Sequence, residues 1–302
     1  MPPRRTFFGS TSLCLLAGLS ATAAHATDYQ RGYLVSSMTL PTSSSQYAID
    51  LDGDGHPENN FGSLAGVLAA QGVDLNGAQA VSVASGGIVH LVSLHSTDRL
   101  FVNDAAAQAD WYVGLAAPSP PRFDGTANLP VDSSIPPATF LAALSGGSFT
   151  SADPATTTTP VELTLELQFG SSKMALALQD ARLSFTLGGS GHMQGQINGS
   201  ILHADILNVV LPTMATWFNE VILADPTSNQ SMQILEIFDT GCGASGGAND
   251  GVIEVCELSG NAIIQTLLAA DVQIGGIDAN SFGAGFTAIA SPDRVFADGF
   301  DP

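Results

Sequence analysis

The sequence predicts an α+β fold, in which an antiparallel, β-rich meander packs with C-terminal amphipathic helices. Apolar and polar residues alternate strictly over residues 161–169, which is the pattern of a strand with one buried and one wet face. Later the period lengthens to that of a helix, and five apolar residues share one helix face: Met214, Trp217, Phe218, Val221 and Ile222. Pro212 suits the first turn of that helix.

The first half of the chain is expected to hold short strands and one helix. Residues 27–49 are polar and extended, and a helix is expected over residues 61–71, where Leu64, Val67 and Leu68 recur at helical spacing. Strands are expected at residues 81–84, 88–94 and 111–115. Loops are expected where proline and threonine cluster, at residues 118–137 and 156–159.

The second half is expected to continue the meander and then to become helical. Strand patterns at residues 183–187 and 193–197 are separated by glycine-rich turns, which favours antiparallel pairing. Ser228 is placed to cap a helix that ends near Phe238, and Ser259 is placed to cap one that ends near Ala269. The last third of the chain is therefore expected to be mainly helical.

Residues 1–26 have the layout of an export signal. Arg4 and Arg5 precede an apolar stretch, and Ala24-His25-Ala26 fits the small-x-small pattern for cleavage after Ala26. The apolar stretch is too short for a stable membrane span. A general secretory signal is favoured over a twin-arginine signal. We therefore expect a secreted, periplasmic or cell-surface protein without membrane insertion.

The mature chain is expected to form a single α+β domain over residues 27–290, followed by a tail over residues 291–302. The alternative is a domain boundary near the threonine run at residues 156–159. No other stretch has the composition of a linker.

The chain is strongly acidic, with 8 Lys+Arg against 28 Asp+Glu and a formal net charge of −20. Loss of Arg4 and Arg5 with the signal leaves 6 bases and a net charge of −22. Phosphate binding needs clustered Lys and Arg, so no nucleic-acid partner is expected. A surface of this sign attracts divalent cations instead. The hydrophobic content of 45% excludes a disordered acidic chain.

Two cysteines remain after the signal, Cys242 and Cys256, and an oxidising compartment favours one disulfide between them. The bond would close a 15-residue loop, which the chain-entropy model values at about 3 kcal/mol. The spacing is not that of a Cys-x-x-Cys redox motif. Two sulfurs with scattered histidines do not have the spacing of a tetrahedral zinc site.

Residues 50–61 match the first part of an EF-hand calcium loop. The three aspartates stand at positions 1, 3 and 5, a glycine stands at the sharp turn of position 6, and two further ligands follow at positions 7 and 9. In chain order these are Asp50, Asp52, Asp54, Gly55, the His56 carbonyl and Glu58. Position 12 is Phe61, so the usual bidentate glutamate is missing. Neighbouring carboxylates repel one another unless a cation compensates, so we expect Ca²⁺ here; the alternative is an acidic turn without an ion.

Residues 246–257 resemble the second half of such a loop. With Gly251 at position 6, the acidic residues Asp250, Glu254 and Glu257 fall at positions 5, 9 and 12. Positions 1 and 3 lack oxygen-bearing side chains, so Asp239 or Asn249 would have to substitute. The loop is expected either to bind a second Ca²⁺ or to be a turn held by the disulfide. Because the two loops are defective in opposite halves, we expect them to pair as EF-hands do, or one loop to bind the ion while the other only supports it.

The first loop resembles the Asp-rich calcium segments of dockerin and thrombospondin type-3 modules, and each loop resembles part of an EF-hand loop. The last nine residues, Arg294-Val295-Phe296-Ala297-Asp298-Gly299-Phe300-Asp301-Pro302, resemble a short (I/V)FxDGFE ending found on secreted proteins of Gram-negative bacteria. The final acid departs from that pattern. Together these segments resemble secreted Gram-negative proteins with EF-hand-like loops, and the resemblance implies export and calcium binding but no enzyme.

No catalytic motif stands out. Ser245 lies in a literal G-x-S-x-G, but a cysteine precedes it and a turn follows, whereas a nucleophile elbow needs a strand and a helix. His90 and His95 are an odd number of residues apart, so they face opposite sides of a strand. We expect an exported calcium-binding protein with a structural or binding role. The alternatives are a secreted hydrolase of glycans or esters and a cell-surface adhesin; the sequence identifies no protein or glycan partner.

Overall fold

The structure, a computed structural model of the chain, describes residues 29–70, 72–151, 160–189, 191–242 and 247–291. The expected export signal, the threonine run, Ser245 and the C-terminal motif lie outside these residues. The elements follow one another in this order: β1 (Tyr29–Thr39), α1 (Asn60–Ala70), α2 (Leu75–Ser85), β2 (His90–Ser96), β3 (Asp104–Val113), β4 (Ala138–Ser145), β5 (Ser148–Thr150), β6 (Leu163–Phe169), β7 (Ser172–Leu187), β8 (Met193–Leu202), α3 (His203–Asp205), the π-helical turn η2 (Ile206–Val210), α4 (Leu211–Ala224), α5 (Asn229–Phe238), α6 (Val255–Gly260), α7 (Ala262–Leu267), β9 (Val272–Ile274) and β10 (Ile277–Ser291).

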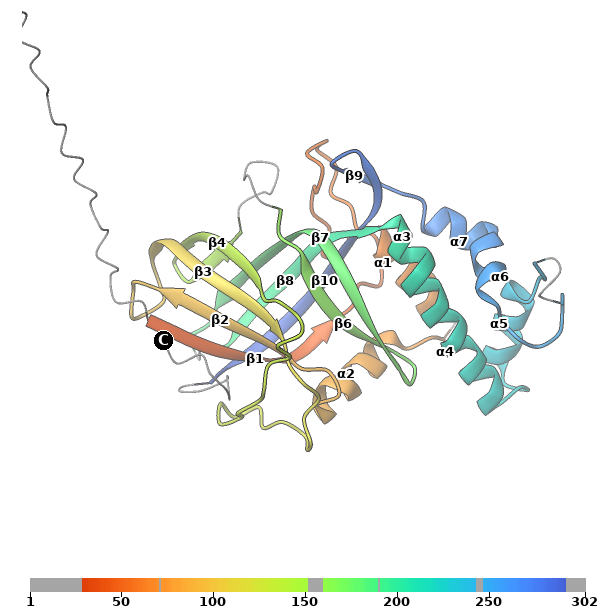
Figure 1. Cartoon of the computed structure of the whole chain (residues 1–302), viewed down its shortest axis with the longest axis horizontal. Coiled ribbons are helices and arrows are strands. Elements are labelled where there is room, and N and C mark those ends of the chain that lie inside the picture. The colour runs from red at the N-terminus through yellow and green to blue at the C-terminus, as the bar shows by residue number, and fades with distance from the viewer. Residues whose placement is uncertain (1–28, 71, 152–159, 190, 243–246, 292–302) are drawn as a thin grey trace, which may run out of the picture.

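Ten strands of the described chain form one antiparallel sheet, in the order β1-β2-β3-β4-β5-β7-β8-β10-β9, with β6 paired to β7. β1 also pairs with β10, from Gly32 opposite Ser291 to Thr39 opposite Gly285. The sheet therefore closes into a ring of eight strands, which β6 and β9 extend. Figure 1 shows the ring at one end of the molecule and helices α3 to α7 gathered at the other. The α+β class and the antiparallel pairing are confirmed, whereas the sequence does not predict the closure.

One hydrophobic core fills the ring and continues under the helices. Val92 and Trp111 are direct partners on β2 and β3, and both are buried. Trp111 packs edge-on against Phe286 of β10, with ring centroids 5.3 Å apart. Phe218 of α4 belongs to the same core and stacks on Phe238 of α5 at 5.1 Å. Each such burial stabilises the fold by roughly 1.5–3 kcal/mol, so packing joins the ring to its helices.

The helices predicted from spacing are present in both halves. α1 covers most of the expected range 61–71, and α4 buries Met214, Trp217 and Phe218 on the predicted face. Ser228 caps α5 as expected, because its side chain accepts a hydrogen bond from the Ser231 amide at 3.1 Å.

The strand expected at residues 81–84 is wrong, because these residues lie inside α2. Asp74 begins that helix by accepting a hydrogen bond from the Gly77 amide at 2.8 Å, and Gly86 ends it in the left-handed conformation. Val81 is 70% exposed on the helix surface. The two caps and the tertiary setting outweigh the strand preference of the valines.

The helix expected from Ser259 to Ala269 is divided into two short helices. α6 ends at Gly260, and Asn261 starts α7 by accepting hydrogen bonds from the amides of Ile263 and Ile264. Asn261, not Ser259, is therefore the cap of the later helix.

The long strand β10 replaces part of the predicted helical third. Gly283 and Gly285 interrupt its apolar pattern, and both have a steric reason. A Cβ on Gly285 would lie 2.5 Å from the Tyr47 ring, and one on Gly283 would lie 2.3 Å from the Tyr47 carbonyl oxygen. The chain before α1 therefore lies close against β10, and only glycine fits there.

The predicted alternation of β6 is present, but its second face is only partly wet, because Glu166 is buried and Thr164 and Gln168 are half-buried. α2 covers it: the Gln79 side chain accepts from the Gln168 amide at 2.8 Å, and Ser82 donates to the Gln168 side chain at 3.0 Å. Glu166, on the same face, is only 6% exposed and pairs with Lys173 at 2.7 Å.

The helical run His203–Ala224 is long and apolar enough, by length and composition alone, to cross a membrane. About half of its most apolar window, 44%, is buried inside the fold. Met214 and Phe218 belong to the core, so the apolar character of this run has a use in packing α4 against the ring.

His90 is a buried base in this core. Its ring lies 5.3 Å from that of Trp111, and its Nε2 lies 3.1 Å from the Glu166 carbonyl oxygen. Burial lowers the pKa of His90 to about 4, because the apolar surroundings disfavour the charged ring, and the charge of Lys173 lowers it further. His95 faces the outer side of the strand, as expected from the odd separation, where it meets Asp110 at 3.3 Å.

We predict that His90 makes the fold less stable in mild acid. The unfolded chain takes up this proton near pH 6.5 and the folded chain only near pH 4, so stability falls as the pH drops between these values, by about 3 kcal/mol in total. Denaturant unfolding in EDTA at pH 7 and pH 5 checks this. His90→Phe should flatten the dependence on pH, and His95→Gln should keep it; an unchanged dependence in His90→Phe contradicts the prediction.

Candidate metal centre

The loop over residues 50–58 lies between β1 and α1, and contacts with the rest of the fold hold it in place. An isolated bridge joins its ends, with the Glu58 amide donating to the Ile49 carbonyl oxygen at 3.0 Å. Leu51 is buried in a small cluster with Val272. Arg182 of β7 donates from both terminal nitrogens, to the carbonyl oxygens of Asp50 and Leu51, at 2.8 Å each. The loop thus has a defined place beside β9 (Figure 1).

Four carboxylates of this loop converge. Asp50, Asp52, Asp54 and Glu58 each offer one oxygen, and these oxygens all lie within 4.8 Å of one another. Oxygens that bind one Ca²⁺ lie 2.3–2.6 Å from it, and so at most about 5 Å apart. The spread of the cluster therefore fits a single calcium ion.

Hydrogen bonds inside the loop set its shape. Asp50 accepts from the Gly53 amide at 2.7 Å and from the Gly55 amide at 2.9 Å. Both glycines have positive φ, +83° and +91°, which explains the glycine at position 6 of the motif. The His56 amide donates to Asp54 at 2.8 Å, and the His56 side chain is exposed. The His56 amide thus helps to hold Asp54 in place, and the role of the His56 carbonyl as a ligand stays a prediction.

Glu58 has the most unusual surroundings of the four carboxylates. One of its carboxylate oxygens, Oε2, is buried and has no hydrogen-bond partner. Burial raises the pKa of Glu58, and the charges of Asp54, Asp52 and Asp50 raise it further, against a lowering hydrogen bond from the Leu51 backbone. A divalent cation in the cluster would give this oxygen a partner and would lower the pKa of Glu58.

Two carboxylates of the second loop, Asp250 and Glu257, accept hydrogen bonds from backbone amides instead. Glu257 is 2% exposed and accepts from the amides of Gly241 at 2.6 Å and Glu254 at 2.9 Å, the latter as part of a capping box for α6. Asp250 accepts from the Val252 amide at 3.0 Å, and Asp239 accepts from the Gly251 amide at 2.8 Å. Among the described residues, Asp250, Glu254 and Glu257 form no common cluster.

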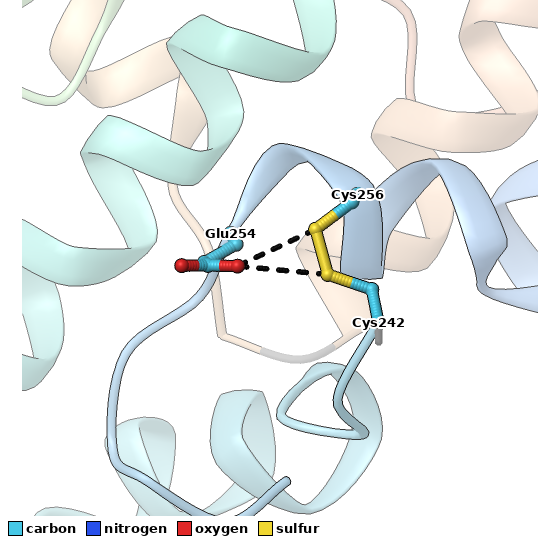
Figure 2. Close-up of side chains that lie close together, drawn as sticks. All are labelled: Cys242, Glu254 and Cys256. Atoms are coloured by element: carbon cyan, nitrogen blue, oxygen red, sulfur yellow. Dashed lines mark hydrogen bonds between the residues drawn. A yellow bond between two sulfur atoms is a disulfide. The ribbon is translucent and has the colours of Figure 1, made fainter. Parts of the chain in front are cut away.

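Cys242 and Cys256 form the predicted disulfide, with Cα atoms 5.7 Å apart. Glu254 lies against this bond: its Oε2 is 3.5 Å from the Cys242 sulfur and 3.4 Å from the Cys256 sulfur (Figure 2). The bond joins the start of α6 to the segment after α5, so the second loop is closed as expected.

The two loops do not pair. The first lies beside β9 and over β7, whereas the second lies near α5 and α6 at the far end of the helices (Figure 1). Asn219 of α4 holds the second loop through two hydrogen bonds with Ile253, both 2.8 Å long. The expectation of an EF-hand pair is therefore wrong, because different parts of the fold anchor each loop.

The fold brings three polar residues together on the outer face of β2 and β3, and sequence reasoning missed the two partners that His95 meets there. The Ser93 hydroxyl and the Asp110 carboxylate both contact the same nitrogen of His95, Nε2, at 3.0 Å and 3.3 Å. A nucleophile relay needs one contact on each ring nitrogen. Ser93 is also fully buried. The three residues thus lack the geometry of a catalytic triad.

At the candidate metal centre, sequence reasoning missed Arg182. A lone arginine in a strand carries no local signal of its role, because its partners are the carbonyl groups of residues some 130 positions earlier.

Comparisons with known proteins find no match to this chain, either among protein-family models, among curated proteins or among solved structures.

We predict that Arg182→Lys lowers the free energy of unfolding in EDTA by about 1–3 kcal/mol. Lysine keeps the charge, but its single ammonium nitrogen cannot reproduce the planar fork with which two guanidinium nitrogens each reach one carbonyl oxygen, and hydrogen bonds to charged groups are worth about 1.5–3 kcal/mol. Urea unfolding checks the value. Arg122→Lys, at an exposed position, is the matched control, and equal stability of the two variants would refute the anchoring role of Arg182.

Proposed function

We propose that residues 50–58 bind one Ca²⁺ and that the protein is an exported, calcium-stabilised protein with a structural or binding role rather than a catalytic one. The observation that carries this proposal is the convergence of four carboxylates, with a buried oxygen of Glu58 that has no partner. Buried carboxylate oxygens are normally hydrogen-bonded or bound to a metal.

The proposed ligands are Asp50, Asp52, Asp54 and Glu58, with the His56 carbonyl as a further candidate. Phe61, at position 12, is buried in α1 and packs on Phe282 with centroids 5.0 Å apart, so that position supplies no ligand. Glu58, at position 9, is therefore the last carboxylate ligand that the loop offers. Hard, flexible oxygen ligands of this kind suit Ca²⁺ better than Mg²⁺, which demands octahedral geometry.

The ion would act on the fold through the anchors of the loop. Leu51 and Arg182 tie the loop to β9 and β7, so a bound ion holds this part of the ring closed. Binding to the native state alone stabilises it by about 2.7 kcal/mol at a hundred times the dissociation constant. The second loop has its carboxylates engaged by backbone amides, and we therefore propose a single ion, with the disulfide stabilising the second loop.

The non-catalytic role rests on the geometry of the polar groups. The Ser93, His95 and Asp110 arrangement is unsuited to nucleophilic catalysis, which argues against the hydrolase alternative at that place. Export follows from the proposed signal, and the net charge of −20 argues against nucleic acid as a partner. A protein or glycan partner would fit a binding role.

We predict that Ca²⁺ raises the melting temperature of the mature protein, relative to EDTA, by roughly 5 °C or more when it is in hundredfold excess over its dissociation constant. Differential scanning calorimetry measures the shift. Asp52→Asn/Asp54→Asn should lose most of it, because two of the four charges are gone.

Asp250→Asn is the matched control for the second loop and should keep the full shift. Melting that is equal in Ca²⁺ and EDTA would refute the proposal, and so would a full shift in the double variant. Loss of the shift in melting temperature in Asp250→Asn would indicate that the ion binds the second loop instead.

A further inference from the structure

The disulfide region gathers three groups that could hold a metal ion once the bond is reduced. The Cys242 sulfur, the Cys256 sulfur and one oxygen of Glu254 lie within 4.8 Å of one another (Figure 2). All three residues are half-buried. While the bond is intact the sulfurs cannot bind a metal as thiolates, so the oxidised protein has no such site.

Hydrogen bonds hold these groups in place independently of the disulfide. The two oxygens of Glu257 accept from the amides of Gly241 and Glu254, and so join the segment before Cys242 to the residue that carries the carboxylate. Asn219 holds Ile253 through its amide and its carbonyl. Breaking the sulfur–sulfur bond therefore leaves the two cysteines next to each other.

The distances suit a tetrahedral zinc ion. Zinc binds sulfur at about 2.3 Å and carboxylate oxygen at about 2.0–2.2 Å, so a sulfur and an oxygen on one ion lie about 3.6 Å apart. Glu254 Oε2 already lies 3.5 Å and 3.4 Å from the two sulfurs. Two zinc-bound sulfurs lie about 3.8 Å apart, a separation that small side-chain rotations after reduction provide.

The site is open to solvent. A groove of about 750 Å³ between α4 and α6 is lined by Glu254 and Cys256, beside the polar side chains of Asn219 and Ser259. A reductant can reach the bond through this groove, and a water molecule can fill the fourth position on the metal.

We propose that reduction of the Cys242–Cys256 bond creates a site for a thiophilic divalent cation, for which Zn²⁺ is the representative. In this reaction the disulfide takes two electrons and two protons from a dithiol, which itself becomes a disulfide. Zn²⁺ then displaces both thiol protons and binds the two thiolates and Glu254, with water as the fourth ligand. Thiolates prefer such ions to the hard cations that suit the Asp50 loop, so this site does not depend on the proposed calcium site.

Cobalt titration of the mature chain, reduced with a phosphine, tests the proposal. The phosphine takes its oxygen from water, and the two hydrogens go to the sulfurs. A thiolate-to-cobalt absorption band arises only from sulfur ligands, so the carboxylate loop cannot produce it. We expect one Co²⁺ per reduced chain, displacement by Zn²⁺ and no band in the oxidised chain.

Variants identify the ligands. Cys242→Ser/Cys256→Ser should show no band, and Glu254→Gln should weaken Co²⁺ binding by about tenfold or more. Glu236→Gln, an exposed carboxylate on α5, should bind like the unaltered protein. Three results would each overturn the proposal: no band in the reduced chain, unchanged affinity in Glu254→Gln, or loss of the native circular dichroism on reduction without recovery when Zn²⁺ is added.

Discussion

The pairing of β1 with β10 is the constraint on which the rest of the structure depends. It joins residues about 250 positions apart, such as Gly32 and Ser291, and turns an open meander into a closed ring. Once the ring is closed, the chain that leaves β1 must run along β10. Asn59 then bonds to the Gly283 backbone through both its side-chain atoms. The acidic loop is held in the same way, over β7 and beside β9.

Closure explains why the acidic loop has a fixed shape in a chain that carries so much negative charge. Arg182 holds the loop backbone through the carbonyl oxygens of Asp50 and Leu51, and the Leu51 side chain packs in the small cluster with Val272. The remaining repulsion falls most heavily on Glu58, whose pKa is raised by burial and by its three acidic neighbours. A loop that kept this arrangement without a cation would carry a persistent electrostatic cost.

Local signals in the sequence predicted the features that depend on near neighbours. The spacing of Met214, Trp217 and Phe218 located α4, and the alternation around Leu165 located β6. The Asp50, Asp52 and Asp54 spacing identified the residues that the fold brings together. Local patterns did not predict the features that depend on distant partners. The closure and the role of Arg182 rest on contacts between residues that are far apart in the chain.

Two segments show how tertiary context acts beyond local pattern. Val81 and Val83 favour a strand by type, yet the Asp74 and Gly86 caps make that segment helical. Glu257 fits position 12 of an EF-hand loop by spacing, but its partners are the amides of Gly241 and Glu254. The same carboxylate that looked like a calcium ligand thus joins the two segments that carry the disulfide, and only the folded arrangement distinguishes these roles.

The most direct test of the calcium proposal is a crystal structure of the mature protein grown in Ca²⁺, with anomalous scattering recorded to identify the ion. The proposal predicts one anomalous peak in the first loop, about 2.3–2.6 Å from oxygens of Asp50, Asp52, Asp54 and Glu58. A loop without such a peak, in which Glu58 Oε2 is hydrogen-bonded to water, would contradict it.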